Sequence, residues 1–267
     1  MIFQVIVWVS MQKWRGRVLF TFIICFIAAT GAGLGNGLAG LSATAVISPM
    51  LITYLHYPAY QAIGIGLATD VISSGVTAYQ YQKSKNVDIR HGAIMLATML
   101  FFTLLGSYIA SLVSNNTMGG FSKIMTLLVG INFLTRKEKK TKEAKSQQNK
   151  IIKVVISGAL LGFMCGFLGT GGGVMILVTL TGLLGYEMKM AVGTSVFIMV
   201  FTAFTGAVTH FIVGGIPDLK ILATCVTVTF IWALIGSKWA SKADDRKLNK
   251  VAGTMLCVLA LVMMLVK

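Results

Sequence analysis

Residues 166–173 read G-F-L-G-T-G-G-G, and residues 37–44, which lie 129 positions earlier, read G-L-A-G-L-S-A-T. Both stretches stand inside long apolar runs. Similar residues recur at the same shift, or at 130, along most of the chain. The matched positions include Leu51, Tyr57, Gly64 and Asp88, which correspond to Leu180, Tyr186, Gly193 and Asp218. Two copies of one half, each interrupted by glycine inside an apolar segment, are typical of secondary transporters.

The composition indicates a membrane protein. Hydrophobic residues make up 56% of the 267 residues and charged residues only 12%, whereas a soluble domain has about 25% charged residues. The mean hydropathy is +0.82. Apolar runs recur from Val18 to near the C-terminus, and several approach the roughly 20 residues that cross a bilayer. The longest polar stretch, 135–150, is too short for a separate soluble domain.

The net charge of +15 raises the question of nucleic-acid binding, but the positions of the charges argue against it. Lys and Arg gather in short segments between apolar runs, at 83–90, 135–153 and 238–250. Basic short loops mark the cytoplasmic side of a membrane protein. We therefore expect a multi-pass protein of the plasma membrane with cytoplasmic basic loops, and no nucleic-acid partner.

The first apolar run, from Val18 to His56, is too long for one crossing. As a straight helix it would measure about 58 Å, and the hydrocarbon core is only about 30 Å thick. We expect the chain to break and fold back at the glycines at 31, 33, 35, 37 and 40, and its counterpart, 151–185, to break at Gly162, Gly166, Gly169 and Gly171 to Gly173. Further spans are expected near 62–82, 91–112 and 118–135, with partners near 189–213, 219–238 and 250–266.

These features predict an all-α polytopic membrane protein of two inverted repeats. Each repeat is a glycine-broken helix hairpin followed by three spans, for about 8–10 membrane segments. The expected divisions are an N-terminal interfacial segment at 1–17, repeat 1 at 18–134, a basic cytoplasmic linker at 135–150 and repeat 2 at 151–267.

The loops then alternate between the two sides of the membrane. The predicted cytoplasmic loops are 83–90, 135–150, 186–188 and 239–249, and the predicted outer loops are 57–61, 113–117 and 214–218. Matched loops of the two halves thus fall on opposite sides. One group of charges disagrees, because Lys13, Arg15 and Arg17 fall outside in this topology.

The glycine segments predict an anion site. A helix that restarts inside the membrane exposes free N–H groups and the positive end of its dipole. Gly171, Gly172 and Gly173 precede one apolar run, and Ser42 to Thr44 precede the other. The candidate substrate-binding residues are Asn36, Gly40, Ser42, Thr44, Cys165, Gly169, Thr170, Gly171, Gly172, Gly173, Thr194 and Ser195. Two alternatives stay open: helix packing through small residues, and helix capping by Thr194 and Ser195.

Asp70 lies well inside apolar sequence. An intramembrane acid is costly and is by default a functional hypothesis, so we expect Asp70 to carry a coupling proton. The alternative is a structural carboxyl that is hydrogen-bonded to Ser73, Ser74 or a neighbouring helix. The other matched acids, Asp88 and Asp218, precede new spans, where an N-terminal carboxylate is expected as a cap.

Neither a metal site nor a cofactor is expected. The four cysteines, at 25, 165, 225 and 257, lie in apolar spans with no CxxC pair and no histidine at metal-ligand spacing. No H-E-x-x-H motif and no pairing of nucleophile and base occurs, so no catalytic residue is assigned and the chain is not expected to be an enzyme.

The chain resembles the TauE/SafE family, the sulfite exporters or 4-toluene sulfonate uptake permeases. The resemblance rests on G-x-x-G-T-G-G-G at 166–173, A-V-G-T-S at 191–195 and F-T-A-F-T-G-A-V-T-H at 201–210. The first half departs from these motifs, with Ser42-Ala43-Thr44 in place of the glycine triplet and Ile65-Gly66 in place of Thr-Ser. The resemblance implies transport of small sulfur-containing anions such as sulfite or organosulfonates, driven by the proton-motive force.

The leading interpretation is thus a secondary transporter, expected to be an exporter, whose partners are a small anion, protons and the lipid bilayer. A channel for small inorganic anions is the alternative, and a scaffold in the membrane is the least specific one. No G-x-x-x-x-G-K-[ST] motif is found, which argues against ATP hydrolysis. Homo-oligomerisation is left open.

Overall fold

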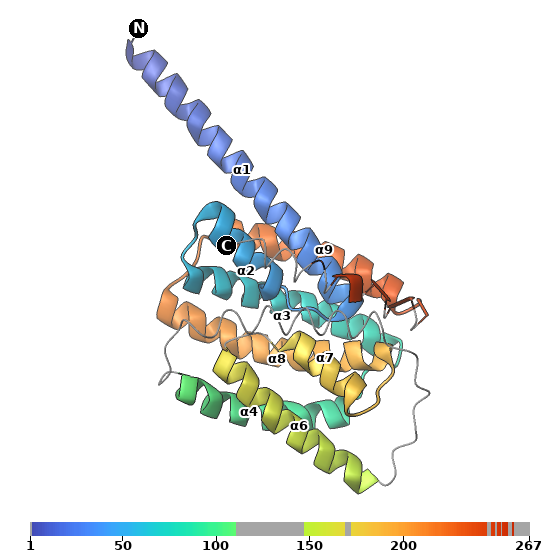
Figure 1. Ribbon diagram of the computed structural model, residues 1–267. Helices are drawn as coiled ribbons and strands as arrows, with labels where there is room; N and C mark the ends of the chain where they lie inside the picture. The colour runs from blue at the N-terminus through green and yellow to red at the C-terminus, as the bar shows by residue number, and fades with distance from the viewer. Residues whose placement is uncertain are drawn as a thin grey trace.

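The computed structural model describes residues 2–110, 147–168 and 172–244, together with 247, 248, 250, 251, 253–255 and 258, and this part of the chain is helical without strands (Figure 1). The predicted span near 118–135, most of the one near 250–266 and most of the linker at 135–150 lie outside the described residues. The repeat boundaries and the interfacial placement of 1–17 stay predictions.

The helices fall into two length classes. Their bounds are α1 Ile2–Ala39, α2 Thr44–Leu55, α3 Ala59–Lys83, α4 Ile89–Ala110, α6 Gln147–Leu168, α7 Gly173–Gly182, α8 Met188–Gly214 and α9 Leu219–Ala240. Four stretches are long and apolar enough to cross a membrane: Val18–Ala39, Tyr60–Lys83, Met188–Ile212 and Leu219–Ala240. The helices α2 and α7, which we call the half-helices, have 12 and 10 residues. They are about 18 and 15 Å long, or roughly half the thickness of the hydrocarbon core of a bilayer.

Both predicted hairpins form, but most of the glycines proposed as break points do not break a helix. The helix α1 continues through glycines 31, 33, 35 and 37 and ends at Ala39. These glycines instead allow close packing: a Cβ added at Gly33 would lie 2.6 Å from the main-chain oxygen of Thr229 on α9. A helical glycine costs only about 1 kcal/mol relative to alanine, which such packing offsets. That expectation was therefore wrong for glycines 31, 33, 35 and 37. It was also wrong for Gly162 and Gly166, because α6 continues through both of them to Leu168.

The helix contacts interlock the two halves of the chain. The helices α3 and α8 pack side by side, α1 packs on α9, and α4 packs on α6. The first helix of each half thus lies against the fourth helix of the other half. The half-helices instead pack within their own halves, with α2 on α3 and α7 on α8 (Figure 1). Neither half forms a separate domain.

Two contacts between loops identify the two ends of this bundle. The main-chain N–H of Asp218 donates to the Tyr57 hydroxyl (3.0 Å), and the Tyr186 hydroxyl donates to the Asp88 carboxylate (2.7 Å). Because α3 runs from beside Tyr57 to beside Asp88, and α8 runs from beside Tyr186 to beside Asp218, these two helices are antiparallel. We call the two ends the Asp218 end and the Asp88 end.

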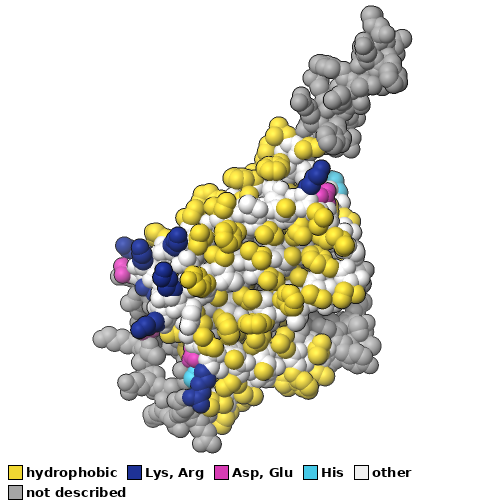
Figure 2. Space-filling model, turned by 180° about the vertical axis from the view of Figure 1, so that it is seen from behind, with side chains coloured by type: hydrophobic (Ala, Val, Ile, Leu, Met, Phe, Trp, Pro, Cys, Tyr) yellow, Lys and Arg dark blue, Asp and Glu magenta, His cyan; other side chains and the backbone are white. Residues whose placement is uncertain are grey.

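The outer surface between these ends is apolar. Figure 2 shows a broad hydrophobic middle, with Lys and Arg gathered mainly along one edge of the molecule. The exposed apolar side chains include Phe22, Phe204 and Ile235, of which 56%, 58% and 49% is exposed. A surface of this kind needs lipid around it, and together with the four long apolar helices it makes the chain a multi-pass membrane protein.

Candidate functional site

The break between α1 and α2 lies at residues 40–43, in contact with α8. Gly40 has a φ of +64°, which favours glycine. A Cβ added there would lie 2.8 Å from the Ser195 hydroxyl oxygen. Both the turn and the close approach therefore require glycine at this position. From the break, α2 runs antiparallel to α1 toward the Asp218 end, because Gly31 lies against Val46 and Tyr57 follows the end of α2.

Asp70 lies in the middle of α3, opposite this break. It follows Ala59, the first residue of α3, by 11 residues, which places it about 16 Å from the Asp218 end of the helix. Only 1% of Asp70 is exposed. Its carboxyl group is therefore at mid-depth in the protein and shielded from lipid.

The Asp70 carboxylate caps the start of α2. It accepts hydrogen bonds from the Ser42 hydroxyl, from the main-chain N–H of Ala43 (2.5 Å), and from the hydroxyl (3.0 Å) and main-chain N–H (3.4 Å) of Thr44. The local N-cap residue, Ala43, offers no side-chain acceptor. An anionic oxygen from another helix thus occupies the site that the positive end of α2 creates.

Asn36 supports the same region from α1. Its amide nitrogen donates to the Ser74 hydroxyl (2.9 Å) and to the main-chain oxygen of Leu41 (3.1 Å), and its amide oxygen accepts from the Thr77 hydroxyl (2.9 Å). Asn36, Ser74 and Thr77 are all fully buried. This network ties the end of α1 to α3 one and two turns beyond Asp70.

The start of α7 lies directly against the first break. A Cβ added at Gly173 would lie 2.8 Å from the main-chain oxygen of Gly40 and 3.3 Å from the nitrogen of Ser42, and it would overlap the Met199 sulfur. The two half-helices thus begin next to each other and run to opposite ends, since α7 leads to Tyr186 and α2 to Tyr57. Among the described residues, no side chain caps α7.

Met199 holds the position in α8 that corresponds to Asp70 in α3 under the shift of 129. Each residue covers the start of the half-helix in its own half: Asp70 covers α2 and Met199 covers α7. The two halves therefore share geometry but differ in chemistry, with a carboxylate in one half and a thioether in the other.

The other candidate residues divide into two groups. Cys165 lies against Gly172, where an added Cβ would be 2.5 Å from the thiol sulfur, and Ser195 lies against Gly40. Thr194 is not with them: its hydroxyl accepts the main-chain N–H of Asp88 (3.0 Å), toward the Asp88 end. Gly169, Thr170 and Gly171 lie outside the described residues.

Reasoning from the sequence did not assign Ser74, Thr77 or Met199 to the candidate site, although it considered Ser74 as a partner of Asp70. All three contribute to the contacts around the two breaks, yet serine, threonine and methionine are common in membrane helices and carry no motif. The signal available was their position: Ser74 and Thr77 follow Asp70 at helical spacings of four and seven, which places them on the same helix face.

The matched acids at the loops behave as predicted. The Asp218 carboxylate accepts the main-chain N–H of Lys220 (2.8 Å), and that of Asp88 accepts the main-chain N–H of His91 (3.1 Å), so both cap the helix that follows. Burial alone would raise the pKa of Asp88, but hydrogen bonds from Tyr186 and His91 lower it below the usual value. Burial, and then the nearby Asp88 carboxylate, raise the pKa of the Tyr186 phenol.

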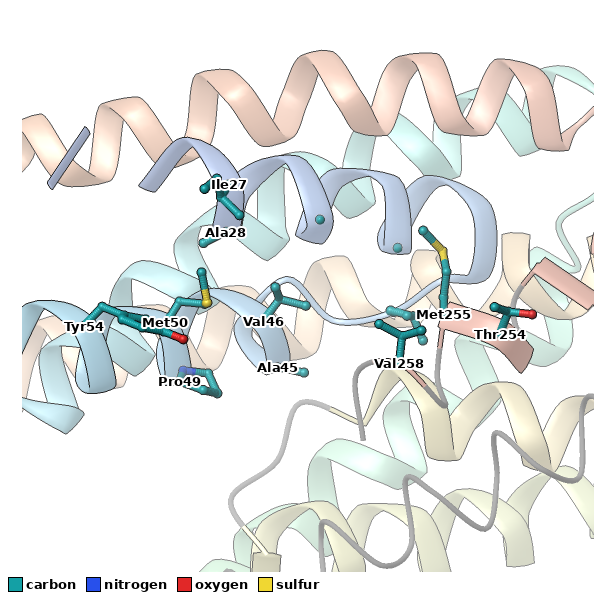
Figure 3. A pocket seen from close by; sticks show the side chains of 13 residues that line it. Ile27, Ala28, Ala45, Val46, Pro49, Met50, Tyr54, Thr254, Met255 and Val258 are labelled. Carbon is teal, nitrogen blue, oxygen red and sulfur yellow. The ribbon is translucent and has the colours of Figure 1, made fainter. Parts of the chain in front are cut away.

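A separate apolar cavity of about 400 Å³ lies between α1 and α2 (Figure 3). Ile27 and Ala28 of α1 face Pro49 and Met50 of α2 across it. Its lining contains none of the polar residues around Asp70, so it is not the candidate anion site. Within the described ranges, no group of three or more His, Cys, Asp or Glu residues is placed to hold a metal ion.

The chain is similar to proteins described as membrane transporters. It is 26% identical to the probable membrane transporter protein YunE of Bacillus subtilis over 76% of this chain and 83% of that protein. It is 24% identical to YdhB of the same organism over 84% and 87%, and 22% identical to MJ0441 of Methanocaldococcus jannaschii over 87% and 91%. Both are also described as probable membrane transporter proteins. No solved structure matches the chain.

The family comparison covers most of the chain, including both half-helix starts and all of α3, α4, α8 and α9. Residues 25–263 match the model of the family described as sulfite exporter TauE/SafE. The chain therefore belongs to the sulfite exporter TauE/SafE family of membrane transporters.

Proposed function

We propose that this protein is a secondary exporter of small sulfur-containing anions, such as sulfite or organosulfonates, which bind at mid-depth where α2 and α7 begin. Family membership supports the class of protein and the class of substrate. The geometry around the two breaks supports the place of binding. We further propose that Asp70 couples transport to protons.

The observation that carries this proposal is the Asp70 carboxylate at the start of α2. The N–H groups of Ala43 and Thr44 and the hydroxyls of Ser42 and Thr44 all point at one carboxylate. Donors arranged in this way bind an oxyanion without a positively charged side chain. A sulfite or sulfonate group presents the same kind of oxygen, so this arrangement suits it as well.

Asp70 and the substrate then compete for the same donors. While Asp70 is ionised, its carboxylate fills the site. When Asp70 takes up a proton, the hydrogen bonds to it weaken, because they are charge-assisted only in the ionised form, and the substrate anion replaces it. The N–H groups of α7, which begins beside Gly40 and Ser42, supply the second half of the site. Anion and proton are therefore bound together and cross together.

This coupling is compatible with export of a dianion. A dianion that leaves with one proton carries a net charge of −1. An inside-negative membrane potential favours its outward movement by about 2.3 kcal/mol per 100 mV. The electrical part of the proton-motive force thus drives export of a dianion such as sulfite, whereas an inward pH gradient opposes it.

The distribution of charge supports a cytoplasmic Asp88 end. Lys83, Lys85 and Arg90 flank the α3–α4 loop, and Lys238 and Lys242 lie where α9 ends. The Asp218 end has Lys220 at the start of α9, and Lys13, Arg15 and Arg17 of α1 precede Val18 at the same end. Short basic loops favour the cytoplasm, so we propose that α2 opens toward the outside and α7 toward the cytoplasm.

Two kinds of contact support an inverted repeat. The first is the helix packing, in which α1 on α9 corresponds to α6 on α4. The second is the pair of contacts at the ends, because Tyr57 and Asp218 correspond to Tyr186 and Asp88 by shifts of 129 and 130. A two-fold axis in the membrane plane relates such contacts to one another.

A flux measurement tests the proposed function. Purified protein in liposomes should carry radiolabelled sulfite at a rate that saturates with sulfite concentration. A negative potential on the substrate-loaded side should accelerate efflux. Flux that rises linearly without saturation would instead indicate the anion channel. Absence of flux for sulfite, thiosulfate and short alkanesulfonates, in protein shown to be folded by circular dichroism, would reject the proposal.

A further inference from the structure

The two tyrosine–aspartate contacts at the ends of the bundle occupy equivalent positions in the two halves of the chain, but they differ in strength. At each end a tyrosine that follows a half-helix meets the aspartate that precedes a long helix of the other half. Tyr57 meets Asp218, and Tyr186 meets Asp88. Each contact joins the two halves of the chain at one end of the bundle.

The contact at the Asp88 end is charged and reinforced. The Asp88 carboxylate accepts hydrogen bonds from the Tyr186 hydroxyl (2.7 Å) and from the main-chain N–H of His91 (3.1 Å), and it lies 2.7 Å from the Nδ1 atom of His91. The main-chain N–H of Asp88 donates to the Thr194 hydroxyl (3.0 Å). Next to it, Gly193 lies so close to the main-chain oxygen of Asn86 that no Cβ would fit. The α3–α4 loop is thus held to the α7–α8 turn at Tyr186 and to the N-terminal part of α8 at Gly193 and Thr194.

The contact at the Asp218 end is neutral and more exposed. There the main-chain N–H of Asp218 donates to the Tyr57 hydroxyl (3.0 Å), while the Asp218 carboxylate caps its own helix through Lys220. Hydrogen bonds to ionised groups are about twice as strong as neutral ones, and solvent weakens an exposed bond further. The Asp218 end is therefore easier to open.

We propose that Tyr186–Asp88 and Tyr57–Asp218 are the two gates of the transport cycle, and that the resting protein opens first at the Asp218 end. Opening one end of the bundle requires breaking only the tyrosine contact at that end. The intact contact at the opposite end keeps the opposite end closed. Tyr57 and Tyr186 act as positioning residues that hold the halves together and do not touch the substrate. This inference rests on the proposed transport function.

Cys165 provides a reporter between the two gates, since it lies against Gly172 at the start of α7. A variant that keeps Cys165 as its only cysteine is labelled with a membrane-impermeant maleimide, once in intact cells and once in inverted membrane vesicles. Tyr186→Phe should raise the labelling rate about tenfold from the face of the Asp88 end, because it removes a hydrogen bond to an ionised group. Tyr57→Phe should raise it about threefold from the opposite face.

The sidedness of labelling decides the inference. A merely structural role for the two tyrosines would raise labelling from both faces in both variants, and that result, or unchanged labelling in Tyr186→Phe, would overturn the gate assignment. With both tyrosines intact, we expect Cys165 to be labelled faster from the face of the Asp218 end. Faster labelling from the face of the Asp88 end would refute the resting state that we infer. The labelling experiment does not depend on anion flux. If each variant is labelled faster from its expected face but the protein carries no anion, the proposed function is refuted and the gate assignment is retained.

Discussion

The meeting of the two half-helix starts makes Gly173→Ala a sharp test of the structure. The added Cβ would overlap the Met199 sulfur and lie 2.8 Å from the main-chain oxygen of Gly40. The methionine side chain can move, but the Gly40 oxygen belongs to a turn that is itself packed on α8. Overpacking of this kind costs about 1–3 kcal/mol.

A matched control exists in the same helix. Gly182, the last residue of α7, has open space where its Cβ would be, so Gly182→Ala should be neutral or stabilise the helix by up to about 1 kcal/mol. The two alanine variants should therefore differ in free energy of unfolding by about 1–4 kcal/mol. At about 2–4 °C per kcal/mol for a chain of this size, Gly173→Ala should unfold about 2–16 °C below the control.

Thermal unfolding in detergent, followed by far-ultraviolet circular dichroism, measures this gap. A double-mutant cycle that combines Gly173→Ala with Met199→Ala tests the contact itself. The double variant should lose less stability than the sum of the two single losses, because the sulfur that the new Cβ would overlap has been removed. If Gly173→Ala and Gly182→Ala unfold at the same temperature, the two half-helices do not begin in contact, and the site proposed between them has no basis.

Three further predictions concern buried groups elsewhere in the bundle. Asn36→Ala should destabilise the fold by about 1–3 kcal/mol, because it leaves buried hydroxyls without their partner, whereas Thr205→Ala at an exposed position should change it by less than about 0.5 kcal/mol; chemical denaturation measures both, and equal losses would contradict the network. The lowered pKa of Asp88 means that its contribution to stability is present above the usual aspartate pKa of about 3.9 and is lost as pH falls through the lowered value, so Asp88→Asn should flatten the acid limb of a stability–pH curve; an unchanged limb would refute that coupling. Gly33→Ala should lower the unfolding temperature, since its Cβ would lie 2.6 Å from a main-chain oxygen, and Gly75→Ala, which meets open space, should not; equal temperatures would contradict the packing of α1 on α9.

The repeated sequence predicted much of the fold, because corresponding residues of the two halves can be matched one by one. The starts of α2 and α7 were expected at Ala45 and Val174 and lie one residue earlier, at Thr44 and Gly173. The break points were harder, since a glycine that ends a helix and one that packs against another helix look the same in a sequence. Gly40 differs from Gly33 only through its positive φ and its contact with Ser195, and both depend on tertiary structure.

The environment of Asp70 shows a second limit. Its place inside an apolar span followed from the residues around it, but the identity of its partners did not. The structural alternative was a bond to Ser73, Ser74 or a neighbouring helix, and the carboxylate binds a neighbouring helix, at Ser42, Ala43 and Thr44. The hydroxyl of Ser73 reaches only the main-chain oxygen of Asp70 (3.4 Å). Pairing across two helices depends on how the hairpin folds against α3, which no local spacing encodes.

The pH dependence of anion binding, with and without Asp70, tests the central claim most directly. A short alkanesulfonate is the suitable probe, because it stays ionised from pH 5 to 8, and isothermal titration calorimetry measures its affinity. If Asp70 and the anion compete for the start of α2, the affinity should rise as pH falls, by up to about tenfold per pH unit, and Asp70→Asn should bind with an affinity that does not depend on pH. The exposed variant Asp244→Asn should behave like the unaltered protein. Equal pH dependence in the unaltered protein and in Asp70→Asn would contradict the account.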